Sequence, residues 1–399
     1  MTTDLINWKT NAWQQKDMVA LYSSRMAEST HRLKHDVEMS LIGQWVVGQD
    51  MIDVGTGTGR SAIHFAEQGL KVLGVDSSQS MLDEARRLAG TTPLDLRLGD
   101  VTKVDVPDAS FDTLTSLNVL VHFPHLEAIL AEFKRIVRPG GRIIFDVHAF
   151  DHLVSIKGQA GAEEHVQQQD VGSYQRFASA EEIVRLADSL GLSVKMMAPY
   201  GLFCQRNHWI RHIQDKHWWR RMLEWIPHDK DMMSLTYALE AEVLARMPTN
   251  VCHRIMVALE HAPDPAGNQS WLDENARRIQ GVLDWDDQVV APDIARLQQA
   301  FGGMRGHRSM TLVYELLRYL VSQNPGLDWR VFFDADQAAV FAKWLQQDTV
   351  DRDMTIINTD WYKRSGQDIS PAVFGTPIGA TLEYRLITNL LTDYAKAFA

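Results

Sequence analysis

The sequence predicts an α/β fold, with a doubly wound parallel sheet over residues 1–205 and a helix-rich domain over residues 206–399. In the first half, short apolar segments alternate with helix-like segments, which is typical of parallel strands joined by crossover helices. A glycine-rich turn follows the first of these strands. In the second half, apolar and tryptophan residues recur mostly at helical spacing. The length of 399 residues also favours two domains over a single core.

The elements expected in the first half follow one another in a regular order. Strands are expected at residues 51–54, 71–75, 94–98, 112–120, 142–147 and 192–197. Helices are expected from the glycine-rich turn to 68, at 81–88, at 126–137 and from 180 to 190. Pro139-Gly140-Gly141 is a typical helix end. Ser179 and Glu182 have the spacing of a capping box, which predicts the start of the last helix.

The second half contains segments of mostly helical spacing. Helices are expected near 209–225, 233–247, 271–282, 294–301, 310–321, 337–345 and 381–397, and short strands at 329–333 and 354–358. These segments are compatible with an acceptor-binding lid, a domain that forms a homodimer, or a second activity. The tryptophans of this half could line an apolar cavity, but core and interface packing is the simpler interpretation.

Composition argues against several classes of protein. The formal net charge is −11 and no basic run stands out, so we expect no nucleic-acid partner. The two cysteines, Cys204 and Cys252, lack CxxC spacing, which argues against a disulfide framework or a cysteine-based zinc site. The N-terminal residues lack the apolar core of a signal peptide, and no apolar run approaches about 18 residues. We therefore expect no membrane association and a cytoplasmic location.

Two groups of residues that include histidines are candidates for metal sites. His208 and His212 have the i, i+4 spacing that can bind zinc on a helix. Tryptophans surround them, however, so a packed amphipathic helix is the simpler interpretation. The second group straddles the end of a strand, where side chains diverge: Asp146, His148, Asp151 and His152. We therefore expect no metal.

The strongest chemical signal is the segment from Asp53 to Gly59, which lies between a strand and a helix. Its three glycines allow positive φ and close approach of the backbone to a ligand. The amides that open the next helix favour a negative group. Asp76 ends the second strand, where a carboxylate can accept hydrogen bonds from a ribose diol. That pairing also suits NAD, but Arg60 stands where the dinucleotide pattern GxGxxG requires its last glycine.

Further segments strengthen one interpretation of this loop. They are Gly74-Val75-Asp76, Leu98-Gly99-Asp100, Phe111-Asp112, Asn118-Val119 with His122, and Arg138-Pro139-Gly140-Gly141. Together with the glycine-rich loop, they resemble the class I S-adenosylmethionine-dependent methyltransferases over roughly residues 40–200. The resemblance implies a Rossmann-like sheet, the cofactor S-adenosyl-L-methionine and the product S-adenosyl-L-homocysteine.

The resemblance also implies roles for individual residues. Gly55, Gly57 and Gly59 would line the methionine and ribose portions, and Asp53 would orient the methionine amino group. Asp76 would hold the ribose hydroxyls. The adenine amino group would donate to Asp100, beside Val101, and Asn118 would lie near the methionine moiety. Tyr22 and Arg25, on an N-terminal helix, are candidates for the carboxylate end. The remaining residues of the expected cofactor site are Thr56, Ser77, Met81 and Val119.

The segment after the fourth strand bears on the acceptor. It lacks the Asn/Asp-Pro-Pro-aromatic motif of exocyclic-amine DNA methyltransferases and the paired glutamates of protein arginine methyltransferases, so we expect a small-molecule acceptor. A hydroxyl or protonated amine acceptor would benefit from a general base. His122 is the first candidate for this catalytic role and His148 the second. Tyr174 and Arg176 are candidates for contacts with the acceptor.

Three alternatives remain open beside O- or N-methylation of a small metabolite, for which natural-product biosynthesis is one setting. The second half could instead dock a peptide or protein substrate. The chain could also be a cofactor-binding subunit that has lost catalysis. Finally, the donor could be a carboxylated S-adenosylmethionine, which an extra basic group near the methyl position would indicate.

Overall fold

The computed structural model describes residues 14, 16–26, 29–168, 173–202 and 230–285, and the single positions 287, 330, 339 and 342. The chain divides into two compact units, Met1–Gln205 with Glu240–Gln280, and Arg206–Leu239 with Gly281–Ala399. Apart from those single positions, the segments expected at 209–225, 294–301, 310–321, 329–333, 337–345, 354–358 and 381–397 lie outside the described residues.

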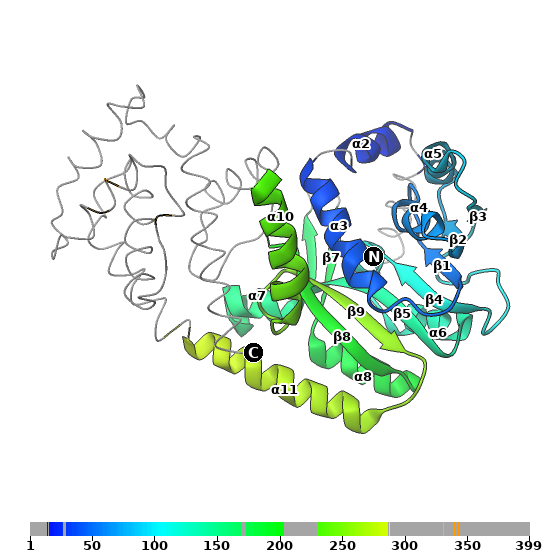
Figure 1. The fold of residues 1–399 in the computed structure, drawn as a ribbon. Helices are drawn as coiled ribbons and strands as arrows, with labels where there is room; N and C mark the ends of the chain where they lie inside the picture. The colour runs from blue at the N-terminus through cyan, green and yellow to red at the C-terminus, as the bar shows by residue number, and fades with distance from the viewer. Residues whose placement is uncertain are drawn as a thin grey trace. The chain divides into compact units, whose positions relative to one another are not determined.

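The first unit is built on one mixed sheet (Figure 1). Its strands are β1 (Asp50–Val54), β2 (Lys71–Asp76), β3 (Asp95–Leu98), β4 (Phe111–Ser116), β5 (Val137–Ala149), β6 (His165–Gln168), β7 (Ser173–Ala178), β8 (Ser193–Tyr200) and β9 (Arg254–Glu260). The strands β3, β2, β1, β4 and β5 are neighbours in that order and run parallel. Strand β9 lies antiparallel between β5 and β8, while the β6–β7 hairpin joins the end of β5. The doubly wound α/β prediction is therefore confirmed for this unit.

The helices cover both faces of this sheet. They are α2 (Lys16–Met26), α3 (Ser29–Gly43), α4 (Arg60–Glu67), α5 (Gln79–Ala89), α6 (Glu127–Ile136), α7 (Phe150–Lys157), α8 (Ala180–Leu190) and α11 (Pro265–Trp285). Helix α10 (Lys230–Ala238) belongs to the second unit. From β1 the chain winds outward toward β3, and from β4 it winds the other way toward β5. Because such crossovers are right-handed, α4 and α5 lie on one face and α6 on the other, beside α8 (Figure 1). The buried apolar residues of α6, α8 and the sheet form one core cluster.

Strand β9 is the main difference from the expected order, because it comes from residues assigned by sequence to the second half. Its pattern, Arg-Ile-Met-Val-Ala-Leu-Glu, is nearly all buried, since neighbours flank the strand on both edges and helices cover its faces. A short, continuous apolar run of this kind has no period that separates a strand from a helix. As a result, residues 240–280 are part of the first compact unit.

Two helix ends predicted from local sequence signals differ in how well they agree with the structure. One of the two hydrogen bonds of the capping box is confirmed, because the Ser179 hydroxyl accepts from the Glu182 amide at 3.1 Å. At the end of α6, however, the helix stops at Ile136, and Pro139-Gly140-Gly141 lies within β5. The expected fourth strand is also shorter, because β4 ends at Ser116 and a 3₁₀ turn covers Leu120–His122.

The motif residues Asp112 and Arg138 act together at the amino edge of the sheet. The Asp112 carboxylate accepts from the amides of Gln49 and Asp50 at 2.9 and 3.0 Å, and Arg138 donates to it at 2.6 Å. Arg138 also donates to the carboxylate of Asp50 at 3.0 Å. These bonds tie together the starts of β1, β4 and β5. The role of both residues is therefore to stabilise the sheet, not to act in the chemistry at its other edge.

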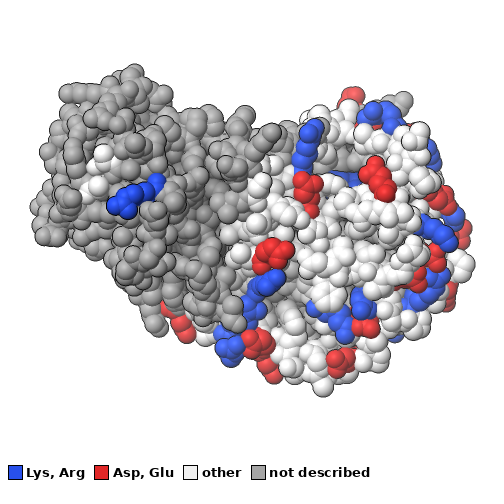
Figure 2. Space-filling view, in the orientation of Figure 1, with Lys and Arg blue, Asp and Glu red and all other residues white. Residues whose placement is uncertain are grey.

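The described surface carries charges of both signs. Acidic and basic side chains are intermixed over the described part of the face in Figure 2, which shows no continuous basic patch there. Within the described ranges, no helix combines the length and the apolar character needed to cross a membrane.

Acid should destabilise the first unit through His152 on α7. The ring is buried, and because the Asn250 carbonyl can only accept, its Nδ1–H donates to that oxygen at 2.9 Å. Burial lowers the pKa of His152 to about 4, against about 6.5 in an unfolded chain. Between these values the unfolded state binds more protons, so this contribution is present above about pH 6.5 and is lost as the pH falls.

The expected loss from His152 is about 2 kcal/mol of unfolding free energy between pH 7 and pH 5. Urea unfolding of the protein and of His152→Gln at both pH values measures it. The variant should lose about 2 kcal/mol less than the parent over this interval. Parallel pH dependence in the two proteins would contradict the assignment.

Candidate functional site

The expected site residues meet at the carboxyl edge of the sheet. Strands β1, β2, β3, β4 and β5 all end at this edge because they run parallel. Strand β8 also ends here and β9 begins here, since Tyr200 and Arg254 are paired in the ladder and Arg254 faces His148. In open α/β sheets, this is the edge at which ligands bind.

The glycine-rich loop after β1 has the conformation that its sequence predicts. Gly55, Gly57 and Gly59 have φ values of 76°, 57° and 78°, in the left-handed region that favours glycine. The amides of Gly55 and Thr56 donate to the Val75 carbonyl at 2.8 and 3.0 Å, which fixes the loop against β2. Among the described residues, none has an atom within 4 Å of the position that a Cβ on Gly57 would take. The loop therefore leaves open space above Gly57.

The side chain of Asp53 fixes this loop to the sheet. Its carboxylate is buried and accepts from the hydroxyls of Thr56 at 2.7 Å and Thr115 at 2.8 Å. Burial raises the pKa of Asp53, and the two hydroxyls oppose that rise. Thr56 thus acts through Asp53 to join the loop to β1 and β4. An interaction of Asp53 with a methionine amino group stays a prediction.

Asp76 links the end of β2 to the same loop. Its Oδ2 accepts from the Gly57 amide at 2.8 Å and its Oδ1 from the Ser78 amide at 2.9 Å. Burial raises the pKa of Asp76, and these amides oppose that rise. Ser78, which the sequence reasoning missed, also caps α5 by accepting from the buried Met81 amide at 3.2 Å. The exposed Ser77 accepts from the Gln14 side chain through its carbonyl at 2.7 Å.

The loop after β3 contains Asp100 and Val101, whose contact with an adenine stays a prediction. Asp100 is exposed, and its Oδ1 accepts from the amide and the hydroxyl of Thr102, both at 2.8 Å. Val101 packs against the core. The carbonyl of Asp76 accepts from the Gly99 amide at 2.9 Å, which brings this loop beside the end of β2.

Asn118 connects β4 to the other half of the edge. Its φ of 58° places it in the left-handed region, where asparagine is tolerated. Its amide donates to Asp146 Oδ1 at 2.5 Å, and its Oδ1 accepts from Lys34 at 3.4 Å. Val119, next in the chain, packs over Gly55.

A buried ion cluster adjoins Asn118, and sequence reasoning did not assemble it. It comprises Lys34 and Glu38 of α3, Arg60 of α4, Asp146 of β5, Tyr200 of β8 and Arg254 of β9. Glu38 binds Arg60 and lies 3.3 Å from Lys34, while Asp146 binds Arg254. The Tyr200 hydroxyl lies 3.0 Å from Glu38 and 3.2 Å from Asp146, and donates its one proton to either carboxylate. The only sequence signal was the i, i+4 spacing of Lys34 and Glu38.

Burial and charge shift the pKa values in this cluster. Burial disfavours ionisation of Glu38, but Arg60 and Lys34 outweigh it and lower the pKa of Glu38 to about 2. Burial, and then the charge of Arg254, lowers the pKa of Lys34 to about 8. Burial raises the pKa of Tyr200 well above 10, so its hydroxyl stays protonated.

Of the N-terminal candidates, Tyr22 lies half-buried on α2. Burial raises its pKa, and the charges of Arg60 and Glu38 also act on it, which places Tyr22 beside the ion cluster. Arg25 is on the same helix, but its side chain lies outside the described residues, as does that of Tyr174 on β7.

The candidates for the acceptor side differ in their surroundings. His122 is half-buried in the 3₁₀ turn after β4. His148 is buried on β5, and its ring lies 4.3 Å from that of His253 and 5.3 Å from that of Phe177, centroid to centroid. Arg176 is buried and donates to the Pro124 carbonyl at 3.0 Å and to Glu182. These bonds tie β7 to the turn after β4, so contact of Arg176 with an acceptor stays a prediction.

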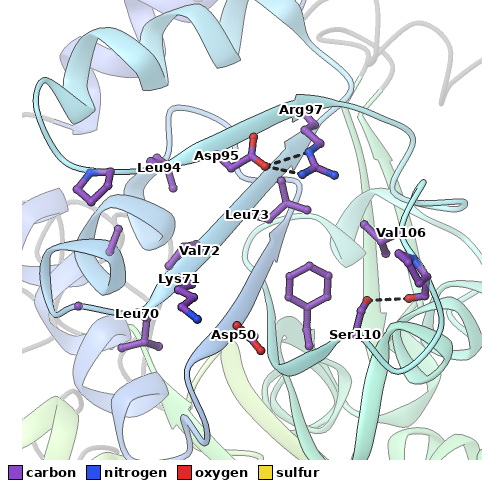
Figure 3. A pocket seen from close by; sticks show the side chains of 15 residues that line it. Asp50, Leu70, Lys71, Val72, Leu73, Leu94, Asp95, Arg97, Val106 and Ser110 are labelled. Carbon is purple, nitrogen blue, oxygen red and sulfur yellow. Dashed lines mark hydrogen bonds and ion pairs between the residues drawn. The ribbon is translucent and has the colours of Figure 1, made fainter.

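A pocket of about 740 Å³ lies at the opposite, amino edge of the sheet (Figure 3). The starts of β1, β2 and β3 line it through Asp50, Lys71 and Asp95. None of the expected site residues lines this pocket. We therefore place the candidate site at the carboxyl edge.

The residues at the carboxyl edge fit S-adenosylmethionine. The open space above Gly57 admits a ligand close to the backbone. Asp76 stands beside it with an ionisable carboxylate, and Asp100 is exposed on the neighbouring loop. This donor and acceptor set suits a nucleoside with a ribose diol.

Gly55→Ala should destabilise the protein more than Gly57→Ala. Both substitutions place alanine in the left-handed region, which costs about 1 kcal/mol. At Gly55 the new Cβ would also collide with Val119, for a total of about 2 kcal/mol. Urea unfolding measures both, and Gly55→Ala combined with Val119→Ala should recover the excess. Equal losses in the two single variants would show that the Val119 contact does not matter.

Comparisons with known proteins agree with this geometry. Residues 52–145 match a family model described as a methyltransferase domain. A malonyl-[acyl-carrier protein] O-methyltransferase of Serratia marcescens is 36% identical over 160 residues, 38% of this chain and 62% of that protein. A ubiquinone biosynthesis O-methyltransferase of Idiomarina loihiensis is 31% identical over 150 residues, 36% of this chain and 62% of that protein.

The chain thus spans less than two thirds of the length of these two relatives. Among solved structures, a SAM-dependent methyltransferase from Thermotoga maritima aligns with a TM-score of 0.41 and 19% identity, over 62% of this chain and 97% of that one. The match at residues 52–145 covers β1 through most of β5, together with the glycine-rich loop, Asp76 and Asn118. Residues 52–145 of this chain therefore belong to the class I S-adenosylmethionine-dependent methyltransferases.

Proposed function

We propose that the whole chain is an S-adenosyl-L-methionine-dependent methyltransferase that acts on an oxygen or nitrogen atom of a small-molecule acceptor. The observation that carries the proposal is the hydrogen bond from the Gly57 amide to Asp76. This bond holds the carboxylate proposed to bind the ribose against a loop with open space above it. The two O-methyltransferase relatives support oxygen as the acceptor atom, and the one named for ubiquinone biosynthesis supports a biosynthetic role.

The cofactor, when bound, supplies a methyl group activated by a sulfonium. The residues of this chain then bind and orient. Asp76 accepts from the ribose hydroxyls, and Asp100 accepts from the adenine amino group. Tyr22 and Arg25 of α2 are proposed for the carboxylate end. The main contribution of such a protein is alignment of the two reactants and exclusion of water.

A general base is needed only where the acceptor carries a proton at neutral pH. His122 is the better placed of the two candidates, because it is half-buried at the carboxyl edge whereas His148 is buried against His253 and Phe177. His122 is the last residue of the 3₁₀ turn that follows Asn118.

Isothermal titration calorimetry of the protein with S-adenosylmethionine, S-adenosylhomocysteine and NAD tests the proposal. We expect the first two ligands to bind and NAD not to bind. Binding of NAD alone, or of none of the three, would reject the proposed function.

A further inference from the structure

Charge balance in the buried ion cluster favours an anion as its ligand. Among the described residues that form its ion pairs, three cations meet two carboxylates: Arg60 with Glu38, Arg254 with Asp146, and Lys34, which shares Glu38. Asp53 also acts on Arg60, but its oxygens accept from the hydroxyls of Thr56 and Thr115. Lys34 is therefore the cation without a carboxylate of its own. A buried charge is costly unless it is paired.

The cations of the cluster, rather than its carboxylates, reach accessible space. The side chains of Lys34 and Arg254 each keep 11% of their surface exposed, while those of Glu38 and Asp146 keep none. Arg254 also lowers the pKa of Lys34, and the two cations are linked through Glu38, the Tyr200 hydroxyl and Asp146. Two cations that repel one another at the rim, backed by buried carboxylates, form a site for an anion.

The position of Arg254 in the sheet separates it from Asp76 and Asp100, two of the expected cofactor contacts, whereas Tyr22 and Asn118, two others, adjoin the cluster. Asp76 and Asp100 lie on the β2–β3 side of β1, whereas Arg254 lies on β9, three strands away on the other side. At about 4.8 Å per strand, Arg254 stands about 14 Å from β1. Asn118 lies between the two halves and contacts Lys34. The Arg254 end of the anion site thus lies on the side of the edge away from Asp76 and Asp100.

We propose that Lys34 and Arg254 bind a carboxylate of the methyl acceptor, so that the acceptor class is a small carboxylic acid. Arginine offers a planar fork that matches a carboxylate, and the Lys34 ammonium adds a point charge. This assignment rests on the proposed function, because it takes the other half of the edge to hold the cofactor. The carboxylate of the cofactor is the alternative source of the same chemistry, and the experiment separates the two.

The probe is succinate, titrated calorimetrically into the protein in the presence and absence of S-adenosylhomocysteine, with succinamide as its neutral counterpart. We expect succinate to bind and succinamide not to bind. Lys34→Met should weaken succinate binding at least about tenfold, since a charged hydrogen bond is lost. Lys34→Arg should retain the binding. Lys71→Met removes an exposed lysine at the opposite edge and should change nothing.

Each other outcome has a defined meaning. If S-adenosylhomocysteine binds but succinate does not, or if Lys34→Met leaves succinate binding unchanged, the anion site is rejected. If Lys34→Met weakens S-adenosylhomocysteine instead of succinate, the carboxylate belongs to the cofactor and the acceptor assignment is wrong. If S-adenosylhomocysteine fails to bind, the proposed function falls, while the titration without it still decides whether the anion site exists.

The pH dependence of succinate binding gives a second readout. Lys34 faces Glu38, Asp146, Arg60 and Arg254, and its pKa of about 8 means that its charge is lost as the pH rises toward 9. Succinate binding should therefore weaken between pH 7 and pH 9 in the parent protein but not in Lys34→Arg, because arginine stays charged. The same weakening in both proteins would exclude Lys34 as its cause.

Discussion

Arg254→Met should lower the free energy of unfolding by about 3–5 kcal/mol. The substitution removes the cation that pairs with Asp146, whose side chain has no exposed surface. The Asn118 amide and the Tyr200 hydroxyl would remain, but neither carries a compensating charge. Urea denaturation followed by circular dichroism measures the loss.

Two variants test whether burial of the pair causes this effect. Arg277→Met removes an arginine from an ion pair with Glu274 whose side chains are 73% and 52% exposed, and it should cost less than about 1 kcal/mol. Asp146→Asn combined with Arg254→Met removes the stranded charge and should recover part of the stability. If Arg254→Met cost no more than Arg277→Met, the cluster would not be the buried network described here.

Asp76→Ala should weaken the binding of S-adenosylhomocysteine by about 100-fold or more. The substitution removes the acceptor proposed for both ribose hydroxyls, and hydrogen bonds to a charged group contribute about 1.5–3 kcal/mol each. It also leaves the Gly57 amide without the carboxylate that now fixes the loop. Calorimetric titration of the variant measures the change.

The control for Asp76 is Asp95→Ala, which removes an exposed carboxylate at the amino end of β3 and should bind like the parent. Asp76→Asn keeps an oxygen for the Gly57 amide but loses the charge, so an intermediate affinity is expected. Thermal unfolding of each variant separates loss of the site from loss of the fold. Parental affinity in Asp76→Ala would show that the end of β2 does not hold the ribose.

Sequence alone predicts the conformation of the edge around Gly57 and Asp76 well, because its signals are local. The loop from Asp53 to Gly59 needs positive φ at three positions, and only glycine adopts that conformation readily. The three glycines therefore predict the conformation of the loop. Asp76 comes directly after an apolar strand of typical length. Each of these features is encoded within a few residues, and the parallel order of β1, β2 and β3 brings them to one edge.

The ion cluster could not be predicted in this way, because it joins residues that are far apart in the chain. Lys34 and Arg254 lie on α3 and β9, and only the tertiary fold brings them together. Arg60 stood out in the sequence only as the residue that breaks a dinucleotide pattern, whereas the structure shows its partner, Glu38. Strand β9 was missed for the same reason, since its neighbours β5 and β8 are what make it a strand.

The position of β9 in the sheet determines when the first unit can finish folding during synthesis. Strand β8 ends at Tyr200, but the strand that separates it from β5 begins only at Arg254. While residues 203–253 are being translated, β5 and β8 therefore lack their shared neighbour, and unpaired strand edges invite association with other chains. The sheet of the first unit becomes whole only when the end of β9 has left the ribosome, so its folding is tied to the progress of translation well into the second half of the chain.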